Sequence, residues 1–214
     1  MGIFDFFKKK TSSLVSEKDS LSKGVANRLI APKPEEYVDL GLSVKWATYN
    51  IGATHPHEHG DYFAWGEVST KSRYTMANSK TEGKDIGDIS GNGSYDTARH
   101  ILGNSWRMPT KEEMEELVNK CTWEWTTQNG VNGYKVIAPN GNTIFFPAAG
   151  KYDSTSLEDV ESLEYVGIQG FYWSSTPEDN LFAQRLVFAN DFHNVMWEGR
   201  ADGLTIRPVL EEKK

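Results

Sequence analysis

The sequence has one cysteine, no long hydrophobic run and none of the common catalytic or nucleotide-binding signatures. A single cysteine, Cys121, excludes an intramolecular disulfide and a thiolate zinc cluster. No apolar run approaches the length of a membrane-spanning helix, so we expect no transmembrane segment. G-x-S-x-G, the P-loop and a G-x-G-x-x-G run that opens a helix are all missing. These absences argue against an enzyme that uses an activated nucleophile or a nucleotide.

The first ten residues, MGIFDFFKKK, do not have the pattern of a secretory signal. Their apolar residues are interrupted by Asp5, and the lysines follow them instead of preceding them. The myristoylation pattern fails because Phe6 stands where Ser or Thr is required. The sequence as written therefore predicts a cytoplasmic protein, with export by a route that reads no cleavable signal as the alternative.

Charge divides the 214 residues into two parts. Residues 1–34 hold seven Lys/Arg against three Asp/Glu, which leaves 16 basic and 27 acidic side chains, a net charge of −11, in residues 35–214. An acidic body of this kind does not favour nucleic acid. All seven Trp lie beyond residue 34, and Pro32 and Pro34 disfavour helix at the boundary. We predict a basic N-terminal extension, 1–34, and one aromatic-rich domain, 35–214.

The extension has the spacing of an amphipathic helix. Its apolar residues near one helical face are Leu14, Val15, Leu21, Val25 and Leu29. Such a helix would dock a partner or an anionic membrane surface. A frayed tail, or a helix packed on its own domain, explains the same pattern.

One helix in the domain is strongly signalled. Thr110 and Glu113 have the spacing of a capping box, in which each side chain bonds the other residue's backbone amide. An apolar face follows at helical spacing, made of Met114, Leu117, Val118 and Cys121. This places Cys121 on the buried side of the helix end, where a core thiol is expected and a nucleophile is not.

The rest of the domain alternates short strands with turns. A shorter helix is expected over 96–102, and 134–146 reads as a hairpin with Asn140-Gly141 at its turn. Glycine-rich 87–93 is typical of a long surface loop. Later strands are expected at 170–175, 182–188, 193–197 and 204–209. The fold class predicted is α+β with mostly antiparallel pairing.

Two clusters have residue types that bind metal ions. His55, His57 and His59 alternate, which suits a transition-metal site, but Pro56 makes an exposed polar turn the simpler interpretation. The loop 85–96 offers carboxylates and amides as calcium sites do, without the EF-hand spacing. Asx turns explain it equally well. We expect no cofactor, with calcium as the open alternative.

Four ordered segments then carry a resemblance to a known family. They are 37–47 (YVDLGLSVKWA) with 50–53, 60–67 (GDYFAWGE), 105–110 (SWRMPT), and 170–176 (GFYWSST) with the closing 206–209 (IRPV). Over 37–209 the chain resembles the "major paralogous domain" family abundant in Bacteroidetes, whose members resemble C-type lectin-like folds. The same fold group includes the variable proteins of diversity-generating retroelements and the formylglycine-generating enzymes. The latter share a run similar to 107–113.

The resemblance implies that the C-terminal segment is a ligand-binding surface on a buried framework. The framework expected to be fixed by burial is Trp173, Leu186, Phe188, Trp197, Arg200, Ile206 and Pro208. Between these lie residues of a mixed, recognition-type composition, which also includes Asp179, Asn194 and Ala201. The ligand-binding candidates are Glu178, Asn180, Gln184, Asn190, Asp191, Phe192, His193, Met196, Trp197, Glu198 and Asp202.

The leading hypothesis is a non-catalytic recognition domain that binds a protein or glycan through 176–203. A variable protein of a diversity-generating retroelement is one form of this hypothesis. It is weakened by Glu178, Gln184, Met196 and Glu198, because adenine mutagenesis of Asn codons does not readily reach the codons of Glu, Gln and Met. Calcium-dependent sugar binding is not favoured, because the sugar-binding tripeptides of C-type lectins are missing. The alternative is a structural or assembly protein docked through its extension. A formylglycine-type enzyme is less favoured, because those relatives use two active-site cysteines and this chain has one.

Overall fold

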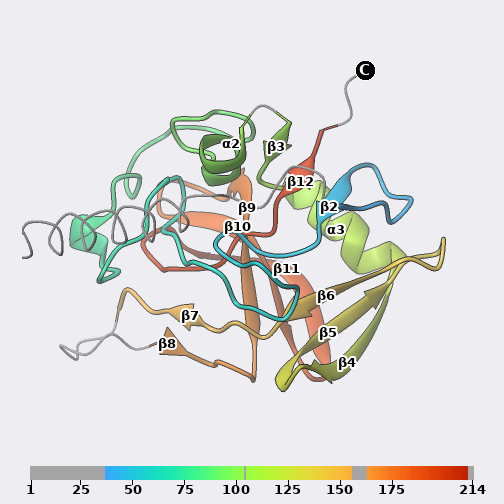
Figure 1. Ribbon diagram of the computed structural model, residues 1–214. Coiled ribbons are helices and arrows are strands. Elements are labelled where there is room, and N and C mark those ends of the chain that lie inside the picture. Colours follow the sequence, from blue (N-terminus) through green and yellow to red (C-terminus); the bar gives the residue numbers. More distant parts are fainter. Residues whose placement is uncertain (1–36, 104, 156–162, 212–214) are drawn as a thin grey trace, which may run out of the picture. The chain divides into compact units, whose positions relative to one another are not determined.

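The computed structural model describes residues 37–103, 105–155 and 163–211 (Figure 1). The expected helix in 1–34 lies outside the described residues. Most regular structure is antiparallel strand, with few helices, which confirms the coarse fold class. Among the described residues, no helix is long and apolar enough to cross a membrane.

Within 37–103, 105–155 and 163–211, the strands form four antiparallel groups. One sheet has the order β1-β2-β12-β3, made of Tyr37–Val38, Lys45–Ala47, Val209–Leu210 and Trp106–Arg107. A second has the order β11-β10-β9, made of Phe192–Gly199, Phe182–Ala189 and Gly170–Pro177. The third, β4-β5-β6, consists of Thr122–Gln128, Val131–Ile137 and Thr143–Pro147. The last is the pair β7 and β8, Lys151–Tyr152 and Leu163–Glu164.

The helices begin where the sequence predicts. Helix α3 (Lys111–Lys120) has the complete capping box, in which the Thr110 hydroxyl accepts the Glu113 amide and Glu113 accepts the Thr110 amide. Helix α2 (Thr97–Leu102) is capped by the Asp96 carboxylate, and a 3-10 turn, η1, covers Met76–Asn78. Cys121 is the C-cap residue of α3 and lies half-buried against the core.

The hairpin around Asn140-Gly141 is confirmed as β5 and β6. Gly141 has φ of +86°, a conformation that favours glycine, and its amide donates to Ala138 at 2.9 Å. β4 was not expected from the sequence, although its residues alternate in burial as a half-covered strand does.

Two local predictions were wrong. Of 204–209, only Val209 belongs to a strand. The backbone groups of Leu204, Thr205 and Ile206 each bond a different segment, so these residues do not pair continuously with one neighbouring strand. The loop 87–93 is not wholly a surface loop, since Ile89 is 1% exposed.

Two hydrophobic clusters lie on opposite faces of the β9-β10-β11 sheet. Side chains alternate between the faces of a strand, so Leu186 and Phe188 of β10 join one cluster and Val187 joins the other. The first cluster also contains residues of α3, β5 and β6, and the second contains Trp65, Trp173 and Ile206. This sheet is therefore covered on both faces along β9 and β10.

Candidate functional site

The candidate recognition segment, 176–203, is the hairpin β10–β11 with its flanking loops. β10 runs between β9 and β11, and the hairpin register runs from Phe182 opposite Gly199 to Ala189 opposite Phe192. In β10 six consecutive residues are buried, whereas β11 is exposed or half-buried throughout. β11 is thus the exposed strand of a sheet whose other two strands lie in the core.

The eleven candidate residues do not share one surface. Alternation along β11 puts Phe192, Met196 and Glu198 on one face, with His193 and Trp197 on the other. Gln184 shares the face of Trp197, its partner in register. The remaining residues lie at the two ends of the hairpin: Asn190 and Asp191 in its turn, and Glu178, Asn180 and Asp202 at the opposite end.

Three large apolar side chains of β11 are exposed. The exposed fractions are 42% for Phe192, 43% for Met196 and 52% for Trp197. Trp197 packs edge-on against Phe182 with ring centroids 4.7 Å apart. The prediction that burial fixes Trp197 was wrong, because β11 is an edge strand among the described residues and leaves this ring 52% exposed. The other framework residues are buried, as predicted.

Gln184, Ala201 and Asp202 were placed on the surface by the sequence and are buried. Gln184 donates its amide to the Glu178 carboxylate, which explains how a polar side chain is tolerated there. Asp202 accepts from Lys151 Nζ at 2.8 Å and from the Ser154 amide at 2.9 Å. These partners are distant in sequence, so no local pattern reveals them.

Lys151 and Arg185 form ion pairs with two acidic residues of the segment, Glu198 and Asp202. Arg185 Nε donates to Glu198 Oε2 at 3.0 Å, and Lys151 Nζ lies 3.5 Å from Glu198 as well as 2.8 Å from Asp202. Burial lowers the pKa of Lys151, but the two carboxylates outweigh burial and raise it overall. Lys151 and Arg185 were not among the predicted ligand-binding residues, but each pairs with a residue that was.

The Arg185 guanidinium is buried beside an aromatic ring. It is 8% exposed and lies 4.9 Å from the Phe171 ring centroid. Its Nη1 is buried and has no hydrogen-bond partner among the described residues. Burial lowers the pKa of Arg185, and Glu198 opposes that shift.

His193 contributes to packing on the inner side of β11. Its ring stacks on Trp123 of β4, with centroids 4.8 Å apart and planes 12° apart. Burial lowers the pKa of His193. This side chain therefore joins β11 to the neighbouring β4-β5-β6 sheet instead of projecting freely.

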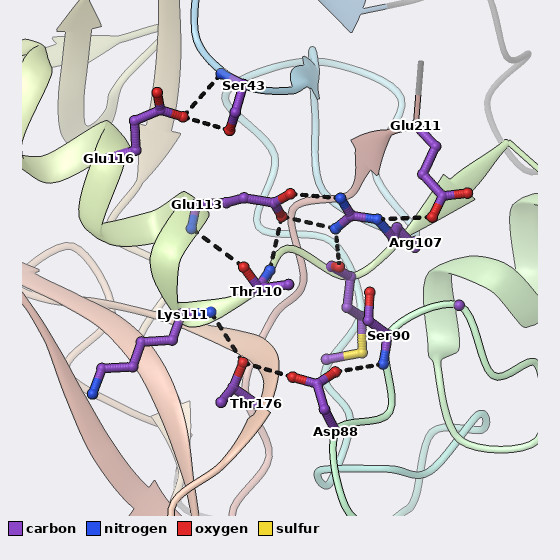
Figure 2. Close-up of polar contacts among 12 residues, drawn as sticks. Ser43, Asp88, Ser90, Arg107, Thr110, Lys111, Glu113, Glu116, Thr176 and Glu211 are labelled. Carbon is purple, nitrogen blue, oxygen red and sulfur yellow. Dashed lines mark hydrogen bonds and ion pairs between the residues drawn. The ribbon is translucent and has the colours of Figure 1, made fainter. Parts of the chain in front are cut away.

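The RMPT run and its capping box form a polar cluster shown in Figure 2. Arg107 makes two bonds to the Glu113 carboxylate, at 2.7 and 2.5 Å, and a third to Glu211 at 3.2 Å. The Thr176 hydroxyl accepts the Lys111 amide at 3.1 Å. These contacts fix the start of α3 to the C-terminal strand and to the end of β9.

In the two candidate metal clusters, several of the side chains that could bind a metal ion contact protein groups instead. His55 Nδ1 lies 3.2 Å from Glu58 Oε1, and the His55 and His57 rings are 5.6 Å apart. In the calcium-like loop, the Asp96 carboxylate caps α2 and Asp88 accepts from Thr176 at 2.8 Å. Within the part of the chain that the structure describes, no group of three His, Cys, Asp or Glu could hold a metal ion.

Comparison with known proteins adds one family match. A model described as "Domain of unknown function (DUF8237)" matches residues 118–209, a span that contains β4 to β11 and the start of β12. No curated protein and no solved structure matches the chain.

Proposed function

We propose that this protein is a non-catalytic recognition domain that binds its ligand through 176–203, with β11 at the centre of the contact. The observation that carries the proposal is the exposure of Phe192, Met196 and Trp197 on one short strand. Aromatic residues and methionine are enriched in protein-binding surfaces. The finer assignment, a C-type lectin-like fold of the "major paralogous domain" type, belongs to the same proposal.

The rigid support of β11 favours binding. Arg200, directly after the strand, is 1% exposed and donates to the backbone carbonyls of Thr81, Lys84 and Asp179. Its guanidinium also lies 4.2 Å from the Trp65 ring centroid. A surface held in place before binding loses little conformational entropy when a ligand arrives.

The absence of catalysis is part of the proposal. Glu198 and Asp202 are engaged in ion pairs, and an engaged carboxylate is a poor general base. Burial raises the pKa of Cys121, and Glu116 adds to that effect, so its thiolate is disfavoured. Both facts support recognition over the formylglycine-type alternative.

Binding should be sought with two probes, a displayed library of random peptides and a printed glycan panel. The test variant carries Phe192→Ser, Met196→Ser and Trp197→Ser together. The matched control is Met76→Ser, because Met76 is 57% exposed and lies in η1. We expect ligands selected on the native chain to bind the control normally and the triple variant at least tenfold more weakly. Selected ligands that bind all three proteins equally would refute the proposal.

A further inference from the structure

The two edges of the β9-β10-β11 sheet differ in how their backbone groups are satisfied. The outer edge of β9 is closed: Trp173 donates its amide to Thr205 at 3.0 Å, and Ser175 donates to Pro109 at 2.8 Å. Ser175 also accepts the Ile89 amide at 3.1 Å. The outer edge of β11 pairs with no strand of the described residues.

The register shows which backbone groups of β11 face outward. The turn between β10 and β11 has two residues, so Ala189 and Phe192 form the hydrogen-bonded pair that closes the hairpin. Alternation from that pair directs the backbone of His193, Val195 and Trp197 away from β10. In agreement, the Val195 amide donates to the Asn194 side chain at 2.8 Å, a local contact that a ligand carbonyl can replace.

Residues 192–197 of the open edge lack the residue types that keep edge strands from pairing. Residues 192–197, FHNVMW, contain no proline, lysine or acidic residue. The edge strand β4, by contrast, carries Glu124, whose side chain is 55% exposed. Glu198, at the end of β11, is neutralised by Arg185 and Lys151.

We infer that the open edge of β11 binds an extended polypeptide segment of basic character, which adds as a fourth strand. Edge pairing supplies backbone hydrogen bonds, and alternate side chains of the added strand would contact Met196 on one face and Trp197 on the other. Because residues 35–214 carry a net charge of −11, they attract a basic segment more strongly than a neutral or acidic one. It also disfavours a second copy of this chain, because two acidic bodies repel each other.

This inference rests on the proposed function and makes its ligand class specific. The peptide most enriched from the displayed library is synthesised as a series, each member N-methylated at one backbone amide. We expect affinity for the full chain to fall by about tenfold at every second position and to change little at the positions between. A loss without this two-residue period would overturn strand addition.

Amide hydrogen exchange of the full chain gives a second readout. On binding the same peptide, the amides of His193, Val195 and Trp197 should slow at least tenfold. Those of Asn194 and Met196 should change little, because they already face β10. Uniform slowing, or slowing confined to other segments, would contradict the inference.

The remaining outcomes separate the two proposals. If only the glycan panel yields a ligand that the triple variant loses, recognition stands and strand addition fails. Sedimentation that shows a dimer disrupted by Met196→Lys would assign the edge to a second copy and overturn the peptide assignment. If neither probe yields a ligand lost by the triple variant, both proposals fail.

Discussion

Arg207 is a buried cation whose hydrogen bonds within the described residues all go to neutral oxygens. It is 0% exposed, donates to Asn50 Oδ1 at 2.7 Å and to the Phe145 carbonyl at 3.0 Å, and lies 4.6 Å from the Phe146 ring centroid. Burial lowers its pKa to about 10. A fixed guanidinium thus joins three segments that are far apart in sequence.

Replacing Arg207 should be costly. Arg207→Met removes the donors and leaves buried oxygens unpaired, so we expect the free energy of unfolding to fall by about 4 kcal/mol. Urea unfolding measures this change. The control, Lys135→Met, removes a side chain that is 47% exposed and should cost less than about 0.5 kcal/mol. Equal losses from the two variants would mean that the Arg207 bonds add nothing net.

His193 should make stability depend on pH. Because burial lowers its pKa below the ordinary 6.5, the folded chain binds this proton less readily than the unfolded chain. Its contribution is complete above pH 6.5 and is lost as pH falls through the folded-state pKa. His193→Gln should therefore show a smaller loss of unfolding free energy between about pH 7.5 and about pH 5. An unchanged pH dependence in this variant would rule out His193 as a source.

Helix α3 depends on a carboxylate with two functions. Glu113 completes the capping box and pairs with Arg107, which itself is 9% exposed. Glu113→Ala should lower the free energy of unfolding by about 3 kcal/mol, because it removes the cap and takes from a buried cation its nearer carboxylate partner. Glu113→Gln keeps an oxygen for the cap and should lose less.

The matched control for Glu113 lies one residue earlier. Glu112 is exposed in the first turn of the same helix, so Glu112→Ala should cost about 0.5 kcal/mol. Chemical denaturation of the three variants gives the comparison. A loss from Glu112→Ala as large as that from Glu113→Ala would assign the effect to helix charge in general.

Elements with local signals were predictable from the sequence. The capping box at Thr110 and the Asn140-Gly141 turn fix backbone geometry within a few residues, so both structures were confirmed. The stretch 204–209 was apolar enough for a strand, but its backbone bonds go to several different segments. Only the tertiary fold decides whether an extended run joins one ladder or several isolated bridges.

The candidate site was predictable only in part, because contacts between distant segments decide which of its side chains are exposed. Phe192 and Met196 were proposed as surface residues and are exposed, whereas Trp197 was also expected to be fixed by burial and is exposed. Gln184 and Asp202 have polar side chains of the kind expected at a surface, but they are buried, because Glu178 and Lys151 reach them. A polar residue type does not reveal whether a distant partner satisfies it.

The acidic charge of residues 35–214 predicts that salt raises the stability of the fold and weakens peptide binding. Residues 35–214 carry 27 acidic and 16 basic side chains, so screening should relieve net repulsion and raise the free energy of unfolding. The same screening should weaken binding of a basic peptide at β11, because attraction to the acidic body falls. Urea unfolding and peptide titration between about 20 mM and about 500 mM NaCl measure both quantities.

The signs of these two effects discriminate between sources of the charge interaction. If salt lowers the free energy of unfolding, favourable ion pairs such as Arg107–Glu113 outweigh the general repulsion. If salt leaves peptide affinity unchanged, charge takes no part in selecting the ligand. Contacts with Phe192, Met196 and Trp197 would then account for recognition, and the basic character of the added strand would be wrong even where strand addition itself holds.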